Sequence, residues 1–271
     1  MNREMNMDKI LKTIGIIIAC IMLFVSCKDY DSPYTEVQMA GVTEFDGTIL
    51  DFLEKGGNQF GLEFDSMMVV VNGIPGLKDS LQQASTDLTV FAVPNGCFQE
   101  AITRLNNYRH VKGKGDDIYL KDLLIEPFVV IEKLPGETPE ADSIIIEHPY
   151  DYRLQLDSLV SRYIFRGTLN TDSLQTYVDG LHTQDFQFNY RMHIQYERQS
   201  ASGVTGMGGR RLVLSDKNGT QLATKWDRSE TQAIDIKTKN GYVHILNNGH
   251  EFGFSKLISE FQNYGNEYIY E

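Results

Sequence analysis

The sequence holds many residue types that support catalysis or metal binding, but no spacing gathers them into a recognised site. It contains no HExxH pair, no CxxC pair and no GxSxG nucleophile turn. The glycine-rich stretch GVTGMGGRR lacks the Lys-Ser/Thr ending of a phosphate-binding loop, so we interpret it as a hairpin tip. Six histidines are scattered without metal-ligand spacing: His110, His148, His182, His193, His244 and His250. We expect no catalytic residue, no metal and no cofactor, with His244 packed in the core and His250 exposed.

Carboxylates are abundant, and they leave open the alternative that the chain is a hydrolase. Glycoside hydrolysis uses two carboxyl groups that face each other across a cleft. The acidic groups of this sequence, such as Asp116-Asp117 and the pair Glu137 and Glu140, lie in expected loops. A solvated surface is the usual interpretation of such groups. A glycan-active hydrolase is therefore the catalytic alternative to a non-catalytic protein.

Charge separates the chain from one class of partner. The formal net charge is −12. Binding to a nucleic-acid backbone depends on clustered Lys and Arg, which neutralise phosphates. We therefore exclude nucleic acid as a partner.

The N-terminal segment has the pattern of an export signal. Lys9 and Lys12 precede an apolar run over residues 14–25, which is shorter than the ~20 residues of a membrane span. The run ends in LFVSC, residues 23–27, which resembles the lipobox of bacterial lipoprotein signal peptides. That resemblance implies that residues 1–26 are removed and that Cys27 carries lipid (palmitate) as a membrane anchor. Residues 27–44 are then a flexible tether, and the protein is expected at the outer membrane, facing the cell exterior.

Cys97 is the one thiol that remains beyond the anchor, since Cys20 lies in the signal segment. No disulfide within the mature chain is then possible. A catalytic cysteine needs a neighbouring base and a lowered pKa. The sequence indicates neither, so we interpret Cys97 as a small buried side chain.

The stretch DLTVFAVPNGCFQEAI, residues 87–102, changes period from a strand to a helix. Leu88, Val90 and Phe91 form a short apolar run, which predicts a buried strand. Pro94 ends that run, and we expect Asn95 to cap the helix that follows it. The turn offers no nucleophile, so we predict a structural joint.

The remaining patterns divide the chain into a helix-rich first half and a β-rich second half. Helices are predicted from a cap at Asp46 to Gly56-Gly57, over residues 62–71, after Pro75, and over residues 154–163. Asn218-Gly219 predicts a hairpin turn, and a second hairpin is predicted around Asn189 between residues 186–188 and 192–196. Residues 128–134 are either a strand or part of a helix. We predict an α+β fold.

Two motifs resemble the signatures of fasciclin-like domains. LTVFAVPNGCF, residues 88–98, resembles the first signature, T-V-F-A-P-T-N-x-A-F, and NGYVHIL, residues 240–246, resembles the second, Asn-Gly-x-x-His. LVSRYIFRGTLNTDSL, residues 159–174, resembles the intervening segment, although Tyr163-Ile164 stands where the family has Tyr-His. The positions that carry the resemblance are Phe91, Pro94, Asn95, Phe98, Asp235, Asn240, Gly241 and His244.

The resemblance implies a single fasciclin-like domain over residues 45–260, with N-terminal helices packed on the β-rich half. An insertion is expected at about residues 107–153, and a tail over residues 261–271. The family's role implies a non-catalytic, lipid-anchored binding or adhesion module for a glycan or protein partner. By analogy it implies an accessory place in an outer-membrane nutrient-uptake complex, beside a porter and its glycan-binding lipoprotein. A purely structural envelope or matrix protein is the other alternative.

Two departures from a minimal domain are free to carry specificity, namely residues 108–152 and residues 186–226. We predict the second as the recognition surface, because aromatic and Arg side chains anchor many interfaces. The alternative is that these aromatic side chains form the inward face of a sheet. The candidate residues are Phe186, Phe188, Tyr190, Tyr196, Trp226, Arg210 and Arg211.

Overall fold

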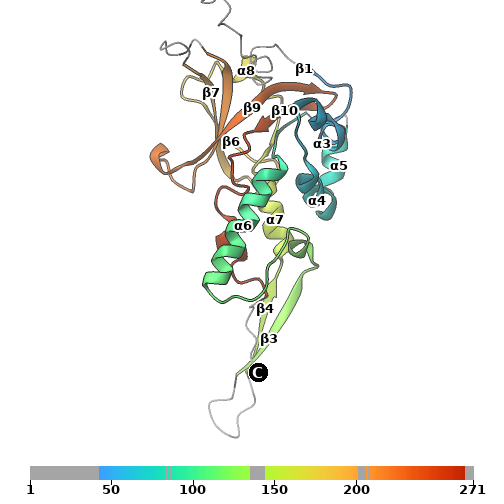
Figure 1. Cartoon of the computed structure of the whole chain (residues 1–271), viewed down its shortest axis with the longest axis vertical. Coiled ribbons are helices and arrows are strands. Elements are labelled where there is room, and N and C mark those ends of the chain that lie inside the picture. Colours follow the sequence, from blue (N-terminus) through green and yellow to red (C-terminus); the bar gives the residue numbers. More distant parts are fainter. Residues whose placement is uncertain are drawn as a thin grey trace, which may run out of the picture. The chain divides into compact units, whose positions relative to one another are not determined.

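The computed structural model describes residues 43–265, apart from residues 84, 86, 135–143, 201–205 and 207. Helices and strands are mixed along this part of the chain (Figure 1), which confirms the predicted α+β class. The α-helices are α3 (Ile49–Lys55), α4 (Asp65–Gly73), α5 (Leu77–Gln82), α6 (Asn95–Val111), α7 (Tyr152–Ser161), α8 (Thr171–Leu174) and α9 (Leu257–Phe261). Short 3-10 helices are η1 (Gly56–Phe60), η2 (Asp122–Leu124) and η3 (Ala223–Lys225).

The described strands form one large sheet and a separate hairpin. The strands are β1 (Thr43–Glu44), β2 (Leu88–Ala92), β3 (Phe128–Leu134), β4 (Ile144–Tyr150), β5 (Ile164–Arg166), β6 (Leu181–Gln184), β7 (Arg191–Arg198), β8 (Arg210–Asp216), β9 (Asp227–Thr238) and β10 (Gly241–Leu246). The large sheet has the order β5-β2-β10-β9-β8-β7-β6, with β1 added parallel to β9. Only β1–β9 and β2–β10 are parallel pairs within it.

The two ends of this sheet approach each other just after β6. The backbone N–H of Phe186 donates to the carbonyl of Ile164 in β5 at 3.0 Å, and Arg166 donates to the carbonyl of Phe186 at 2.8 Å. The sheet is therefore nearly closed. Residues 186–188 lie outside the strands, so the predicted hairpin around Asn189 pairs β6 with β7 instead.

The helices α3, α4 and α5 lie together beside the sheet (Figure 1). α3 begins with a capping box: Thr48 accepts from the backbone N–H of Asp51, and the Asp51 carboxylate accepts from the backbone N–H of Thr48. The prediction that Asp46 caps this helix was wrong, because Asp46 lies two residues earlier and pairs with Lys239 at 2.7 Å. α5 begins at Leu77, and Leu77 and Leu81 are buried as expected.

The core lies between these helices and the sheet. Every residue of β2 is buried, which agrees with the predicted buried strand. Phe91 packs edge-on against Phe165 of β5, with ring centroids 5.8 Å apart, and Phe98 stacks on Phe252 at 4.2 Å. These contacts join the central strands, α6 and the segment after β10 in one apolar core.

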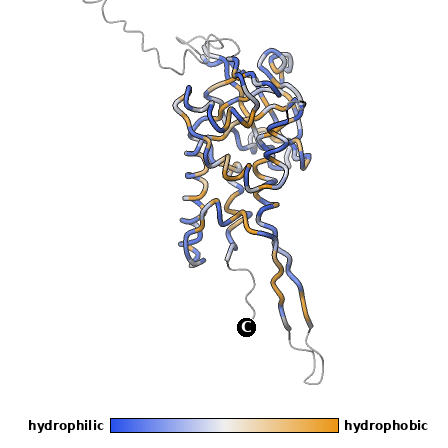
Figure 2. The backbone as a smooth tube through the Cα atoms, turned by 90° about the vertical axis from the view of Figure 1, so that its right-hand side faces the viewer, coloured by the Kyte–Doolittle hydropathy of each residue, from blue (hydrophilic) through white to orange (hydrophobic). Residues whose placement is uncertain are grey.

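The chain between α6 and α7 forms the insertion. α6 continues to Val111, so the insertion begins after a helix that is longer than expected. The hairpin β3–β4 pairs seven residues with seven and confirms the strand alternative for residues 128–134. Figure 1 shows this hairpin extending away from α6 and α7, and Figure 2 shows apolar residues along it.

An aromatic cluster fixes the base of the hairpin. Phe128 and Tyr150 stack at 5.5 Å, and Tyr152 contacts both of them, as well as Phe261 at 5.9 Å and Tyr264 at 4.9 Å. Because Phe261 is fully buried, the domain does not end at residue 260 as predicted. β1 likewise begins before the predicted boundary at residue 45.

No helix in the described part of the chain is long and apolar enough to cross a membrane. Residues 1–42, which include the predicted signal segment, Cys27 and most of the tether, lie outside the described residues.

Candidate functional site

The turn between β2 and α6 connects the start of α6 to the start of α4. The Asn95 side chain accepts from the backbone N–H of Ser66 at 2.8 Å, in the first turn of α4, and the Asn95 N–H donates to the carbonyl of Glu63 at 3.0 Å. α6 itself has Pro94 at its N-cap, with no side-chain capping bond. The prediction that Asn95 caps its own helix was therefore wrong, because its side chain caps α4 instead.

The turn between β9 and β10 holds two further helices. The Asn240 side-chain oxygen accepts from the N–H of Ile49 at 2.8 Å, at the start of α3. Its amide nitrogen donates to the carbonyl of Leu81 at 2.9 Å, in α5. Gly241 follows with φ 149°, and a Cβ there would lie 1.7 Å from the carbonyl oxygen of Leu88. Only glycine lets β10 approach β2 this closely.

Asp235 and His244 hold the bulged part of β9. Asp235 has φ 57°, and its carboxylate accepts from the backbone N–H of Thr171 at 2.8 Å and from the Thr171 hydroxyl. His244 accepts at Nδ1 from the N–H of Asp235 at 3.0 Å, so Nε2 carries the proton and donates to the carbonyl of Leu169 at 2.8 Å. Burial lowers the pKa of His244, although the nearby Asp235 charge opposes this shift. His244 is a neutral bridge between backbone groups.

His250 is buried, although the sequence predicts it to be exposed. Tyr163 explains the difference, because its hydroxyl donates to His250 Nε2 at 2.7 Å and accepts from the N–H of Gly253 at 2.8 Å. Burial lowers the pKa of His250 to about 3. This histidine is therefore neutral at physiological pH. The loop after β10 thus supplies both hydrogen-bond partners of the buried Tyr163 hydroxyl.

Cys97 is buried in the first turn of α6. Its thiol donates to the carbonyl of Asn247 at 3.5 Å. Burial raises the pKa of Cys97 to about 12, so the thiolate that a nucleophile requires is not formed near neutral pH. Cys97 is a packing residue.

The predicted recognition residues do not lie together on one face. Alternation along β7 puts Ile194 and Tyr196 on the face that packs against the core, and Phe186 and Tyr190 also contact the core. Tyr190 is held further by Asp216, which accepts from its hydroxyl at 2.7 Å. The inward-face alternative describes Phe186, Tyr190 and Tyr196.

Trp226 lies on the opposite face of the sheet, against His193 at 4.8 Å and His182 at 5.9 Å. Its indole N–H donates to the carbonyl of Thr220 at 3.0 Å. Arg211 forms ion pairs with Glu197 at 2.8 Å and with Glu230 at 2.6 Å. The neighbouring Arg210 donates to the Thr171 hydroxyl at 3.4 Å, and Phe188 is 36% exposed in a turn.

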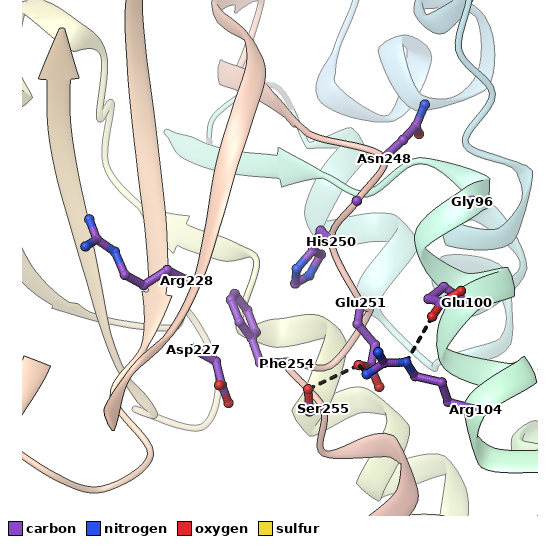
Figure 3. Close-up of a pocket in the computed structure, with 11 residues that line it drawn as sticks. Gly96, Glu100, Arg104, Asp227, Arg228, Asn248, His250, Glu251, Phe254 and Ser255 are labelled. Atoms are coloured by element: carbon purple, nitrogen blue, oxygen red, sulfur yellow. Dashed lines mark hydrogen bonds and ion pairs between the residues drawn. The ribbon is translucent and has the colours of Figure 1, made fainter. Parts of the chain in front are cut away.

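A charged pocket of about 400 Å³ lies between α6, the start of β9 and the loop after β10. Figure 3 shows Arg104 between the carboxylates of Glu100 and Glu251. Arg104 donates to Glu100 at 2.9 Å and to Glu251 at 2.5 Å, and the charge of Glu251 is the main cause that raises the pKa of Arg104. In a glycoside hydrolase the substrate lies between the two catalytic carboxylates. Here the Arg104 guanidinium occupies the space between Glu100 and Glu251.

No cluster of three or more His, Cys, Asp or Glu side chains suited to a metal ion occurs among the described residues.

The hairpin presents an apolar face that the sequence did not single out. Register pairs Val129 with Pro149 and Ile131 with Glu147, and alternation puts Ile145 on the same face. The side chains of Val129, Ile131 and Ile145 are 52%, 54% and 60% exposed. We call Val129, Ile131, Ile145, Glu147 and Pro149 the hairpin face. The alternation was present in FVVIEKL and IIIEHPY, but it does not say which face is covered.

No protein-family model matches the sequence, and no curated protein matches it. Among solved structures, the chain is similar to a pair of FAS1 domains from the insect cell adhesion molecule fasciclin I. The identity is 13%, the TM-score is 0.38, and the match covers 70% of this chain but only 44% of that chain. At that score the likeness carries no weight for fold or function.

Proposed function

We propose that this chain is a non-catalytic binding module of the fasciclin-like type, anchored to the outer membrane through lipidated Cys27. Its type is supported by the two motif segments, which lie side by side as the parallel pair β2–β10, with Gly241 opposite Leu88 and His244 opposite Phe91. A non-catalytic role is supported by the polar motif residues, since Asn95, Asn240 and His244 bond to backbone groups of neighbouring elements. The anchor is supported by LFVSC alone.

The observation that carries the binding role is the hairpin face. Three branched aliphatic side chains stand more than half exposed on a two-stranded sheet whose base is fixed in the aromatic core. Arg153 adds to this base through a double contact with Glu126, at 2.7 and 2.9 Å. Contact of this apolar surface with water is unfavourable, so a partner that covers it gains binding free energy. A rigid base lowers the entropy that such binding would cost.

We assign the hairpin face to a folded protein. Branched aliphatic side chains lack the flat ring on which a sugar stacks, which argues against a glycan there. A second copy would bring two chains of net charge −12 together and place one Glu147 near another. A partner with an apolar patch and a basic rim fits this face. A porter or a glycan-binding lipoprotein of an outer-membrane nutrient-uptake complex is the partner we propose.

The test is capture of a partner from detergent-solubilised native membranes by the lipidated protein. Ile131→Ser combined with Ile145→Ser should reduce the captured partner at least tenfold. Val111→Ser is the matched control, because Val111 is 83% exposed at the end of α6 and is not part of the hairpin. Equal capture by the hairpin variant and the control would contradict the assignment, and so would a stable dimer of the purified chain that the hairpin variant breaks.

The anchor has a separate test. Cys27→Ser should leave the precursor unprocessed and free of lipid, as shown by mass and by labelling with a fatty-acid analogue. Normal processing and normal lipid labelling of the variant would remove the anchor from the proposal without touching the hairpin face.

A further inference from the structure

An open groove of about 690 Å³ runs along α6, between that helix, the start of α4 and residues 117–121. We call it the α6 groove. It shares no residue with the hairpin face, and of the two sequence motifs only Phe98, the last residue of the first, lines it. The buried Phe98 and the half-buried Ile102 line it from α6, together with the apolar Val69 and Leu120 from the other side, and a row of polar side chains follows α6.

One rim is a row of side chains along α6. Gln99, Thr103, Asn107 and His110 recur at helical spacing and are all exposed. From the first to the last, the row covers roughly 16 Å at the rise of an α-helix. Gln99, Thr103 and Asn107 are uncharged and carry both donors and acceptors. The row ends at His110, which pairs with Asp117 at 2.8 Å.

The opposite rim carries Tyr119, which is 62% exposed. The backbone on both sides of it is fixed. Asn106 is buried and bonds both the carbonyl and the N–H of Ile118, at 2.9 and 3.1 Å. The N–H of Tyr119 donates to the Asp122 carboxylate at 2.7 Å, and the N–H of Asp122 donates to the carbonyl of Tyr119 at 2.9 Å. A large aromatic ring is thus held toward solvent on an ordered segment.

We propose that the α6 groove binds a neutral oligosaccharide. A sugar ring offers an apolar face that packs on Tyr119 and hydroxyl groups that both donate and accept, as do Gln99, Thr103 and Asn107. The length of the row suits a chain of several sugars rather than a single one. Asp65, Asp117 and Lys121 line the groove, which leaves one excess negative charge there, and the chain is strongly acidic, so acidic sugars are disfavoured.

An amphipathic helix is the other occupant that a groove beside a helix could take. The row of uncharged polar side chains along α6 favours the sugar, because an amphipathic helix would need a rim as apolar as the Val69 and Leu120 side of the groove. This makes the peptide an outcome of the test rather than a second proposal.

The experiment uses the full lipidated chain in detergent on an array of neutral oligosaccharides, with uronic-acid oligosaccharides as the charged comparison. We expect binding to at least one neutral series, followed by titration calorimetry with that oligosaccharide. Tyr119→Ala and Asn107→Ala should each weaken binding at least tenfold, and Tyr119→Phe should retain most of it. Tyr177→Ala is the matched control, since Tyr177 is 46% exposed elsewhere.

No binding to any neutral oligosaccharide at millimolar concentration overturns the proposal. Binding that Tyr119→Ala and Asn107→Ala leave unchanged also overturns it, as does preference for uronic acids or for an amphipathic peptide. Unchanged melting temperatures of the variants separate lost binding from lost folding. The combined Ile131→Ser and Ile145→Ser variant should bind the sugar normally, so the groove and the hairpin face fail or stand independently.

Discussion

Phe91 and Ile131 are both apolar residues near the middle of a strand, yet Phe91 is fully buried and Ile131 is 54% exposed. Phe91 belongs to β2, which pairs on both sides and lies under helices. Ile131 belongs to β3, whose one partner among the described strands is β4. We call the parallel pair β2–β10 with its flanking turns the β2–β10 joint. Apolar strand residues are buried in this joint, whereas apolar strand residues of the insertion are exposed.

This difference indicates that the β2–β10 joint stabilises the fold and that the insertion provides exposed surface for binding. In the β2–β10 joint, polar side chains such as Asn240 form hydrogen bonds with backbone groups of other elements. Substitutions there should change the free energy of unfolding. In the insertion, ordered backbone holds side chains that nothing described in the chain covers, such as Ile131 and Tyr119. Substitutions there should change binding with little change in stability.

Gly241 should give the largest effect on stability. Gly241→Ala would put a Cβ 1.7 Å from the carbonyl oxygen of Leu88, so β10 and β2 must separate. We expect a loss of more than about 4 kcal/mol in the free energy of unfolding, measured by urea titration. Gly219→Ala is the control, because that glycine has φ 68° but open space around it, and it should cost only about 1–2 kcal/mol. Similar losses for both would show that β2 and β10 have room to adjust.

Phe91→Ala comes next. Removing a fully buried phenylalanine should cost about 3–5 kcal/mol. Ile131→Ala in the hairpin should stay within about 0.5 kcal/mol, because the side chain is already exposed. Thermal and urea unfolding of the two variants measure the contrast. A loss at Ile131 that matched the loss at Phe91 would mean that the hairpin face is covered inside the folded chain.

His250 should make stability depend on pH. Its pKa is about 3 in the folded protein and about 6.5 in the unfolded chain, so the unfolded state binds the proton first as pH falls. The stability is complete above pH 6.5 and decreases below it, by about 2 kcal/mol at pH 5. His250→Gln should flatten this dependence by about that amount. His193 and His244, whose pKa values burial also lowers, leave a remaining slope of the same sign. An unchanged slope in the variant would contradict the neutral His250.

Asn95 should give the smallest of these effects. Asn95→Ala removes the cap of α4 and should cost about 1 kcal/mol. Asn107→Ala, exposed on the same helix, should cost less than about 0.5 kcal/mol. Ser66→Pro removes the N–H that Asn95 caps, in a helical turn that tolerates proline. In that background Asn95→Ala should add nothing. A full additional loss would mean that Asn95 acts on another element.

The parts of the fold that the sequence predicted are those set by near neighbours. Pro94 ends a strand, and Asn218-Gly219 turns the chain with positive φ at both residues, because of their own backbone limits. The hairpin has a longer loop than the predicted tight turn, because β8 and β9 pair only from Asp216 and Asp227. The partners of Asn95 and His250 could not be read in this way. Ser66 lies 29 residues from Asn95, and Tyr163 lies 87 residues from His250, so only the packed fold brings them together.

The binding residues were harder to predict for a different reason. Alternation predicts two faces for a strand but not which face is covered. Tyr196 of β7 lies on the face that packs against the core, and Tyr190, just before β7, packs against the core as well. In β3 and β4 one face was left bare. The aromatic residues therefore indicated the wrong place for exposed surface, and the plain aliphatic residues of the insertion were overlooked.

Photo-crosslinking on intact cells tests the division between joint and insertion most directly. A photoreactive amino acid at position 131 should give one discrete crosslinked protein, because Ile131 lies within the hairpin face. The same amino acid at position 111, where Val111 is 83% exposed on α6, should give none. Position 131 without a product, or the same product from both positions, would contradict the account.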